Sequence, residues 1–68
     1  MNEAKDITEL YLGEKNINEI TQHITVCKNL KKLNLNDNLI PYIEHLHKLG
    51  ELIELNLSFN KIRTIQNL

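Results

Sequence analysis

The chain of 68 residues is long enough for one small domain. Eight Lys and Arg residues stand against nine Asp and Glu residues, a formal net charge of −1, which argues against binding nucleic acid or a membrane through bulk positive charge. No apolar run approaches the ~20 residues of a transmembrane helix, no secretory signal is visible, and the single cysteine, Cys27, cannot form an internal disulfide. We therefore expect a soluble, cytoplasmic protein, with a ciliary or nuclear location as the alternatives.

The first predicted element follows a polar start, residues 1–6, which we interpret as a minimal cap or a frayed tail. A period-two pair of leucines, Leu10 and Leu12, predicts a short strand. Five aliphatic residues of this element precede aliphatic residues further on by 23 positions: Ile7, Leu10, Leu12, Ile17 and Ile20.

The second and third elements are related by a shift of 22 residues. Eight of the seventeen positions from Leu30 to Leu46 are identical after the shift, where composition alone would give about two. The identical pairs are Leu30/Leu52, Leu33/Leu55, Asn34/Asn56, Leu35/Leu57, Asn38/Asn60, Ile40/Ile62, Ile43/Ile65 and Leu46/Leu68. An extra residue between Ile20 and Ile24 accounts for the longer first spacing. We therefore predict repeats over about 7–29, 30–51 and 52–68.

The segments LKKLNLNDNLIPYI and LIELNLSFNKIRTI resemble the leucine-rich repeat pattern, L-x-x-L-x-L-x-x-N-x-L/I. The 22-residue period is similar to that of the intracellular class found in the regulatory subunit of protein phosphatase 1 and in a leucine-rich repeat dynein light chain. The resemblance implies an α/β leucine-rich repeat solenoid that is right-handed, with parallel strands on a concave side and short helical segments on a convex side. It also implies a protein partner, which the repeat itself does not specify.

Each repeat should contribute the same set of positions to the interior. The expected strand leucines, turn asparagines and following isoleucines are Leu33, Leu35, Asn38 and Ile40, then Leu55, Leu57, Asn60 and Ile62. The resemblance implies that the two asparagines are buried and pair with backbone groups of the turn, which suits an amide because it both donates and accepts.

A short helical return should follow each turn. The spacing of Ile43, Leu46 and Leu49 predicts a helix or 3₁₀ segment, for which Pro41 suits the start and Gly50 the end.

The two ends of the chain differ from its middle. In the first repeat, Lys15 stands at the asparagine position and Asn16 follows one place late. Terminal repeats often depart from the repeat pattern in this way. The third repeat stops at Leu68 within its return segment, where Leu55, Leu57 and Ile62 would lack cover. We therefore expect the N-terminal part of a longer repeat protein, or a chain that docks on a partner or self-associates through its open C-terminal repeat.

The outward strand positions form the candidate partner-binding face, with Tyr11 as its one large side chain and therefore its candidate anchor. Glu9, Lys32 and Glu54 should lie side by side on neighbouring strands and alternate in charge. Their charges should largely cancel, so this row should not attract a charged partner from a distance. The alternative is an ordinary solvated sheet face. Phe59, just after the third strand, is either exposed at the rim or packed against Asp37. The outward positions are Glu9, Tyr11 and Gly13; Lys32, Asn34 and Asn36; Glu54, Asn56 and Ser58.

The sequence contains few residues that could form a catalytic or metal-binding site. Cys27 aligns with Leu49 and should be a buried apolar residue. His45 and His47 flank the inward-facing Leu46 and should point to solvent, without the further ligands that a metal site needs. The only serine, Ser58, falls on a predicted strand, and the two glycines lie too far apart for a phosphate-binding loop. We expect no catalytic residue, metal or cofactor.

The sequence therefore favours a non-catalytic protein–protein interaction module, acting as a scaffold or regulatory subunit, with neither nucleic acid nor membrane as a partner. Two alternatives stay open. The chain could be the structural N-terminal cap of a longer repeat protein, or a set of repeats appended to a catalytic domain.

Overall fold

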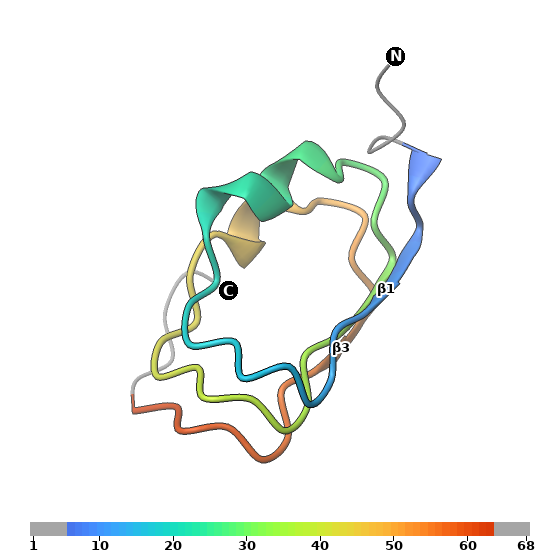
Figure 1. Ribbon diagram of the computed structural model, residues 1–68. Coiled ribbons are helices and arrows are strands. Elements are labelled where there is room, and N and C mark those ends of the chain that lie inside the picture. Colours follow the sequence, from blue (N-terminus) through green and yellow to red (C-terminus); the bar gives the residue numbers. More distant parts are fainter. Residues whose placement is uncertain (1–5, 64–68) are drawn as a thin grey trace.

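Successive coils of the chain stack one behind the next, and each passes through a strand at the same place (Figure 1). The computed structural model describes residues 6–63. Within them the strands are β1 (Glu9–Tyr11), β2 (Lys32–Asn34) and β3 (Glu54–Asn56), and the 3₁₀ helices are η2 (Gln22–Val26) and η3 (Leu46–Lys48). The 3₁₀ helices lie across the coil from the sheet, on what we call the return side (Figure 1).

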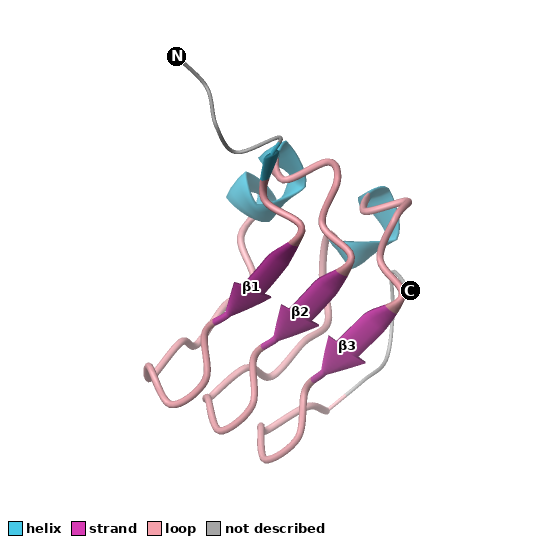
Figure 2. Cartoon of the chain, turned by 90° about the vertical axis from the view of Figure 1, so that its right-hand side faces the viewer, coloured by secondary structure: helices cyan, strands magenta, loops and turns pink. Residues whose placement is uncertain are grey.

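The strands form a parallel sheet in chain order, β1-β2-β3 (Figure 2). Leu10 pairs with Leu33, and Leu33 pairs with Leu55, at chain separations of 23 and 22 residues. These are the two spacings that the sequence repeat predicts, so the predicted strand register is confirmed. The first coil accommodates its extra residue in the region of η2, which has five residues where η3 has three.

The core lies in the second coil, because that coil has a neighbour on each side. Two further buried residues, Ile20 and Cys27, join it from the first coil. The matching aliphatic residues of the outer coils pack against this cluster but are only partly buried. The second-coil aliphatic side chains that are at most 5% exposed are Leu30, Leu33, Leu35, Ile40, Ile43, Leu46 and Leu49.

The third coil is less buried than the repeat pattern predicts. Leu55, Leu57 and Ile62 are half-buried rather than buried. Within residues 6–63 only β2 lies beside β3, so the side chains of the third coil are covered from one side. Ile65 and Leu68, which the repeat matches to core positions, lie outside the described residues.

Asn38 connects the second coil to the first. Its Oδ1 accepts hydrogen bonds from the backbone N–H groups of Lys15 and Ile17, at 3.0 and 2.9 Å. Its Nδ2 donates to the carbonyl oxygens of Leu12 and Leu35, at 2.9 and 3.0 Å. The residue is 4% exposed. The prediction of a buried amide that pairs with backbone groups is therefore confirmed for Asn38, whereas Asn60 is half-buried rather than buried.

Asn60 makes the corresponding connection between the third coil and the second. Its Oδ1 accepts from the N–H of Ile40 at 3.0 Å, and its Nδ2 donates to the carbonyl of Leu35 at 2.9 Å. The Leu35 oxygen thus accepts from both asparagines. Each amide reaches back to the preceding coil. Lys15, at the matching place of the first coil, is exposed, as expected of an atypical terminal repeat.

A left-handed residue stands just before the asparagine position in each described coil. The φ angle is 56° at Glu14, 57° at Asp37 and 58° at Phe59. This conformation costs a residue other than glycine about 1–2 kcal/mol, so the turn imposes it. Phe59 is 81% exposed. Of the two placements predicted for Phe59, exposure at the rim is therefore the one observed.

The helical return is shorter than predicted. η3 begins only at Leu46, after His45 with a left-handed φ of 69°, and it ends at Lys48. Pro41 therefore does not start the helix, and Gly50, in the turn beyond, does not have the positive φ of a helix-ending glycine. His47 is exposed as predicted, whereas His45 is half-buried rather than solvent-facing.

Candidate partner-binding face

Figure 2 views the sheet from its outer side. Because the strands are in register, equivalent residues form rows that cross them. We call this outer side the strand-side face. One row contains Glu9, Lys32 and Glu54, and the next contains Tyr11, Asn34 and Asn56, because the register pairs these residues in turn. The prediction that Gly13, Asn36 and Ser58 lie on strands is wrong: β1, β2 and β3 end at Tyr11, Asn34 and Asn56, and these three residues follow the strand ends.

Tyr11 is the largest side chain of this face. It is 59% exposed, and its hydroxyl donates a 2.8 Å hydrogen bond to Oε1 of Glu9. This bond and, more weakly, the negative charges of Glu9 and Glu54 raise the pKa of the Tyr11 phenol above its usual value. The ring is therefore exposed while its hydroxyl is held in one direction, which suits a contact residue.

Removing the charge of Glu9 should lower the pKa of Tyr11. In a Tyr42→Phe background Tyr11 is the single tyrosine, so its ionisation can be followed by ultraviolet absorbance. We expect the titration midpoint to lie above ~10, and Glu9→Gln to move it down. The raised pKa also implies that the hydrogen bond contributes stability below the midpoint and is lost as pH rises through it. An unchanged midpoint in Glu9→Gln would show that Glu9 does not hold the hydroxyl.

Two asparagines of the face use their oxygens locally, which the sequence pattern did not predict. Oδ1 of Asn34 accepts from the N–H of Asn36, and Oδ1 of Asn56 accepts from the N–H of Ser58, both at 2.9 Å. A side chain bonded to the backbone two residues on is the common asparagine turn. These amides therefore shape the strand ends, so they are weaker candidates for partner contacts than Tyr11.

Gly13 makes room for Asn36 at the edge of the face. A Cβ atom on Gly13 would overlap Oδ1 of Asn36 and come within 3.3 Å of its backbone carbonyl oxygen. The Asn36 amide also donates to Oδ2 of Asp37 at 2.6 Å. The face is therefore ordered by contacts within the chain.

Sequence reasoning missed several large apolar side chains that are exposed elsewhere. Ile53, just before β3, is 78% exposed. Its N–H bonds the carbonyl of Lys31, and the N–H of Lys31 bonds that of Thr8, so the three residues occupy one place in successive coils. The sequence did contain a signal of this exposed apolar side chain, because the repeat aligns Ile53 with polar residues of the other two coils.

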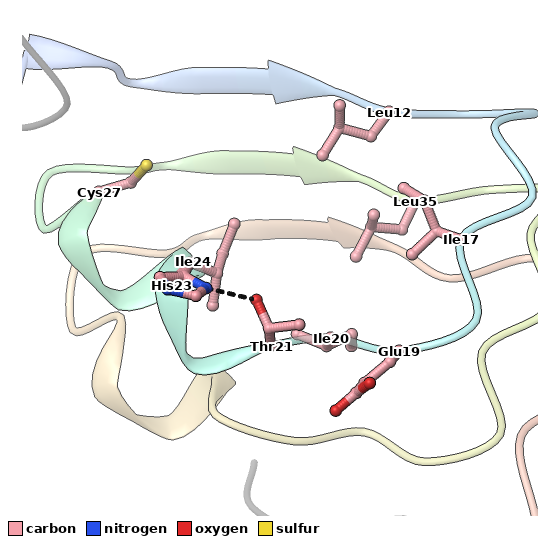
Figure 3. A pocket seen from close by; sticks show the side chains of 9 residues that line it. All are labelled: Leu12, Ile17, Glu19, Ile20, Thr21, His23, Ile24, Cys27 and Leu35. Carbon is pink, nitrogen blue, oxygen red and sulfur yellow. Dashed lines mark hydrogen bonds between the residues drawn. The ribbon is translucent and has the colours of Figure 1, made fainter.

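An apolar hollow of about 270 Å³ opens inside the first coil (Figure 3). Thr21 Oγ1 and His23 Nδ1 lie 3.4 Å apart at its wall. Cys27, at 7% exposed, confirms the prediction of a buried cysteine. Five aliphatic side chains and Cys27 make up most of its lining and belong to or pack against the core, so the hollow opens onto the hydrophobic core. Its lining residues are Leu12, Ile17, Glu19, Ile20, Thr21, His23, Ile24, Cys27 and Leu35.

Within residues 6–63, no group of three or more His, Cys, Asp or Glu side chains is arranged to hold a metal ion. Nor does any helix described there have the length and apolarity to cross a membrane.

Comparison with known proteins agrees with the coil geometry. The searches of curated proteins and of solved structures gave no significant match. The family model for leucine rich repeats, in contrast, matches residues 5–62, which is most of the chain. The parallel strands at 22- and 23-residue spacing and the asparagine turns are the structural form of that repeat. The chain therefore belongs to the leucine-rich repeat family.

Proposed function

We propose that this chain is a non-catalytic protein–protein interaction module, acting as a scaffold or regulatory subunit, and that it binds its partner through the strand-side face. Leucine-rich repeats commonly mediate protein–protein interaction, which supports the general role. The single observation that carries the choice of face is the state of Tyr11, whose ring is 59% exposed while its hydroxyl is bonded to Glu9.

Tyr11 has the properties of an interface anchor. Binding energy concentrates in aromatic side chains that become buried in the complex. A ring whose hydroxyl is already held loses less conformational entropy on binding than a free one. The neighbouring charges of Glu9, Lys32 and Glu54 would contribute orientation more than strength, because exposed ion pairs are worth only about 0–1 kcal/mol each.

Replacing Tyr11 with alanine should weaken partner binding by about 2 kcal/mol or more, a fall in affinity of about 30-fold. His47 is an exposed residue of η3 on the return side, so His47→Ala is the matched control and should bind as the wild type does. Calorimetric titration of the three proteins against a partner isolated by affinity capture gives the comparison. If His47→Ala loses affinity and Tyr11→Ala does not, the binding face lies on the return side.

One of the alternatives predicts a different result. If the chain is a structural cap of a longer solenoid, substitutions on this face should leave partner binding unchanged. A set of repeats beside a catalytic domain is the other alternative, and it is compatible with either result. We further propose that the coils wind right-handed, because parallel crossover connections are right-handed in about 98% of cases. We also propose that the strand-side face is concave, as the leucine-rich repeat pattern implies. We place the protein in the cytoplasm, where its single cysteine would stay reduced.

A further inference from the structure

One row of the strand-side face alternates in charge across the whole sheet. Glu9 on β1 pairs in register with Lys32 on β2, and Lys32 pairs with Glu54 on β3. Both glutamates are exposed and the lysine between them is half-buried. Neighbouring strands lie about 4.8 Å apart, so the row spans about 10 Å in the order negative, positive, negative.

The spacing of this row matches an α-helix laid across the strands. Successive turns of a helix rise about 5.4 Å, and positions i and i+7 lie about 10.5 Å apart. An extended segment crossing the sheet fits less well, because side chains on one face of a strand recur at about 6.6 Å. A strand running parallel to β1–β3 would meet one charge of the row rather than three.

We propose that the strand-side face binds an α-helical segment of a protein partner that crosses the three strands and carries a basic, an acidic and a basic side chain on successive turns. This inference rests on the proposed function and adds the chemistry of the partner. Opposite charges at all three places complement the row, whereas any other order brings like charges together. Complementarity of this kind selects partner and orientation more than it adds affinity.

Tyr11 sets the direction of the bound helix. The row itself reads the same from either end, so its charges cannot distinguish the two directions. Tyr11 lies beside Glu9 at the β1 end, and the corresponding side chains on β2 and β3 are Asn34 and Asn56. The helix therefore presents its apolar contact residue at the β1 end, next to the basic residue that pairs with Glu9.

The test uses two stapled helical peptides that differ at one residue. The first carries Lys, Glu and Lys at positions i, i+4 and i+7, and the second carries Lys at all three. Fluorescence anisotropy in low salt measures both against the wild-type chain, Lys32→Glu and Lys48→Glu. Lys48 is an exposed lysine at the end of η3, so Lys48→Glu changes the net charge equally and serves as the control. Circular dichroism checks that each variant folds. If the three adjacent glutamates of Lys32→Glu prevent folding, Lys32→Gln is used in its place.

The wild type and Lys48→Glu should prefer the peptide with the central Glu, by about 3- to 10-fold, and Lys32→Glu should prefer the all-Lys peptide. With Lys32→Gln the preference should fall to about twofold or less. High salt should reduce every preference, because exposed charges are screened. Reversal by Lys48→Glu as well, or binding of neither peptide, overturns the proposal. A third result separates this proposal from the proposed function: both peptides bind, Tyr11→Ala weakens the binding of both, and Lys32→Glu changes neither affinity. In that case the face does not distinguish the order of charges, which overturns this proposal, but the proposed function stands.

Discussion

Replacing Leu35 with alanine should lower the free energy of unfolding by about 2–5 kcal/mol. Leu35 is 3% exposed and belongs to the buried cluster of the second coil. Coils above and below it hold its surroundings in place, so the cavity left by the lost side chain cannot collapse. A small domain has only about 5–15 kcal/mol of stability, and often less, so thermal and urea unfolding followed by circular dichroism should show a large loss.

Leu39→Ala is the matched control for this substitution. Leu39 lies in the same coil, but it is 42% exposed, so its truncation should cost well under about 1 kcal/mol. A Leu35→Ala protein that melts with the wild type would contradict the proposed register of the repeat.

The period of the sequence was enough to predict the strand register and most of the core. In a solenoid each coil contacts the next through equivalent residues, so the alignment of Leu10, Leu33 and Leu55 in sequence is also their alignment in space. The burial of Asn38, in contrast, was implied by the resemblance to leucine-rich repeats and not by the period itself; it suits an amide because a buried polar side chain needs partners.

The degree of burial could not be predicted from the repeat. Leu33 and Leu55 are the same residue at the same repeat position, yet Leu33 is buried and Leu55 is half-buried. The difference comes from what covers each coil, which is a property of the array and not of the residue. The start of η3 was also missed, because the positive φ at His45 follows from the path of the chain and has no glycine to mark it.

The candidate face was predicted in outline and not in its internal contacts. Alternation along each strand placed Glu9, Tyr11 and Lys32 outward, since inward and outward positions must alternate. It gave no sign that Tyr11 bonds Glu9 or that Asn34 bonds the backbone of Asn36. Outward positions are free of packing constraints, so their contacts depend on side-chain geometry that a repeat pattern does not contain. For the same reason the pattern is silent on the partner.

Asn38→Ala should destabilise the chain by at least about 2 kcal/mol, because one truncation removes partners from several backbone groups at once. The N–H of Ile17 and the carbonyl of Leu12 both bond the Asn38 side chain, and a buried group left without a partner costs about 1–3 kcal/mol. The carbonyl of Leu35 keeps its bond from Asn60. Urea unfolding should therefore show a lower midpoint. The loss should also appear as faster amide exchange at Ile17, which lies in the first coil rather than in the coil of the substitution.

Lys15→Ala is the control that distinguishes this mechanism from a general effect of alanine in the turn. Lys15 occupies the same repeat position as Asn38, but it is exposed, and it bonds Asn38 through its backbone N–H, which donates to Oδ1. Since alanine keeps that N–H, the free energy of unfolding should change by less than about 0.5 kcal/mol. Equal losses from Lys15→Ala and Asn38→Ala would mean that the turn position is sensitive in every coil. The asparagine would then not act by reaching back to the coil before it.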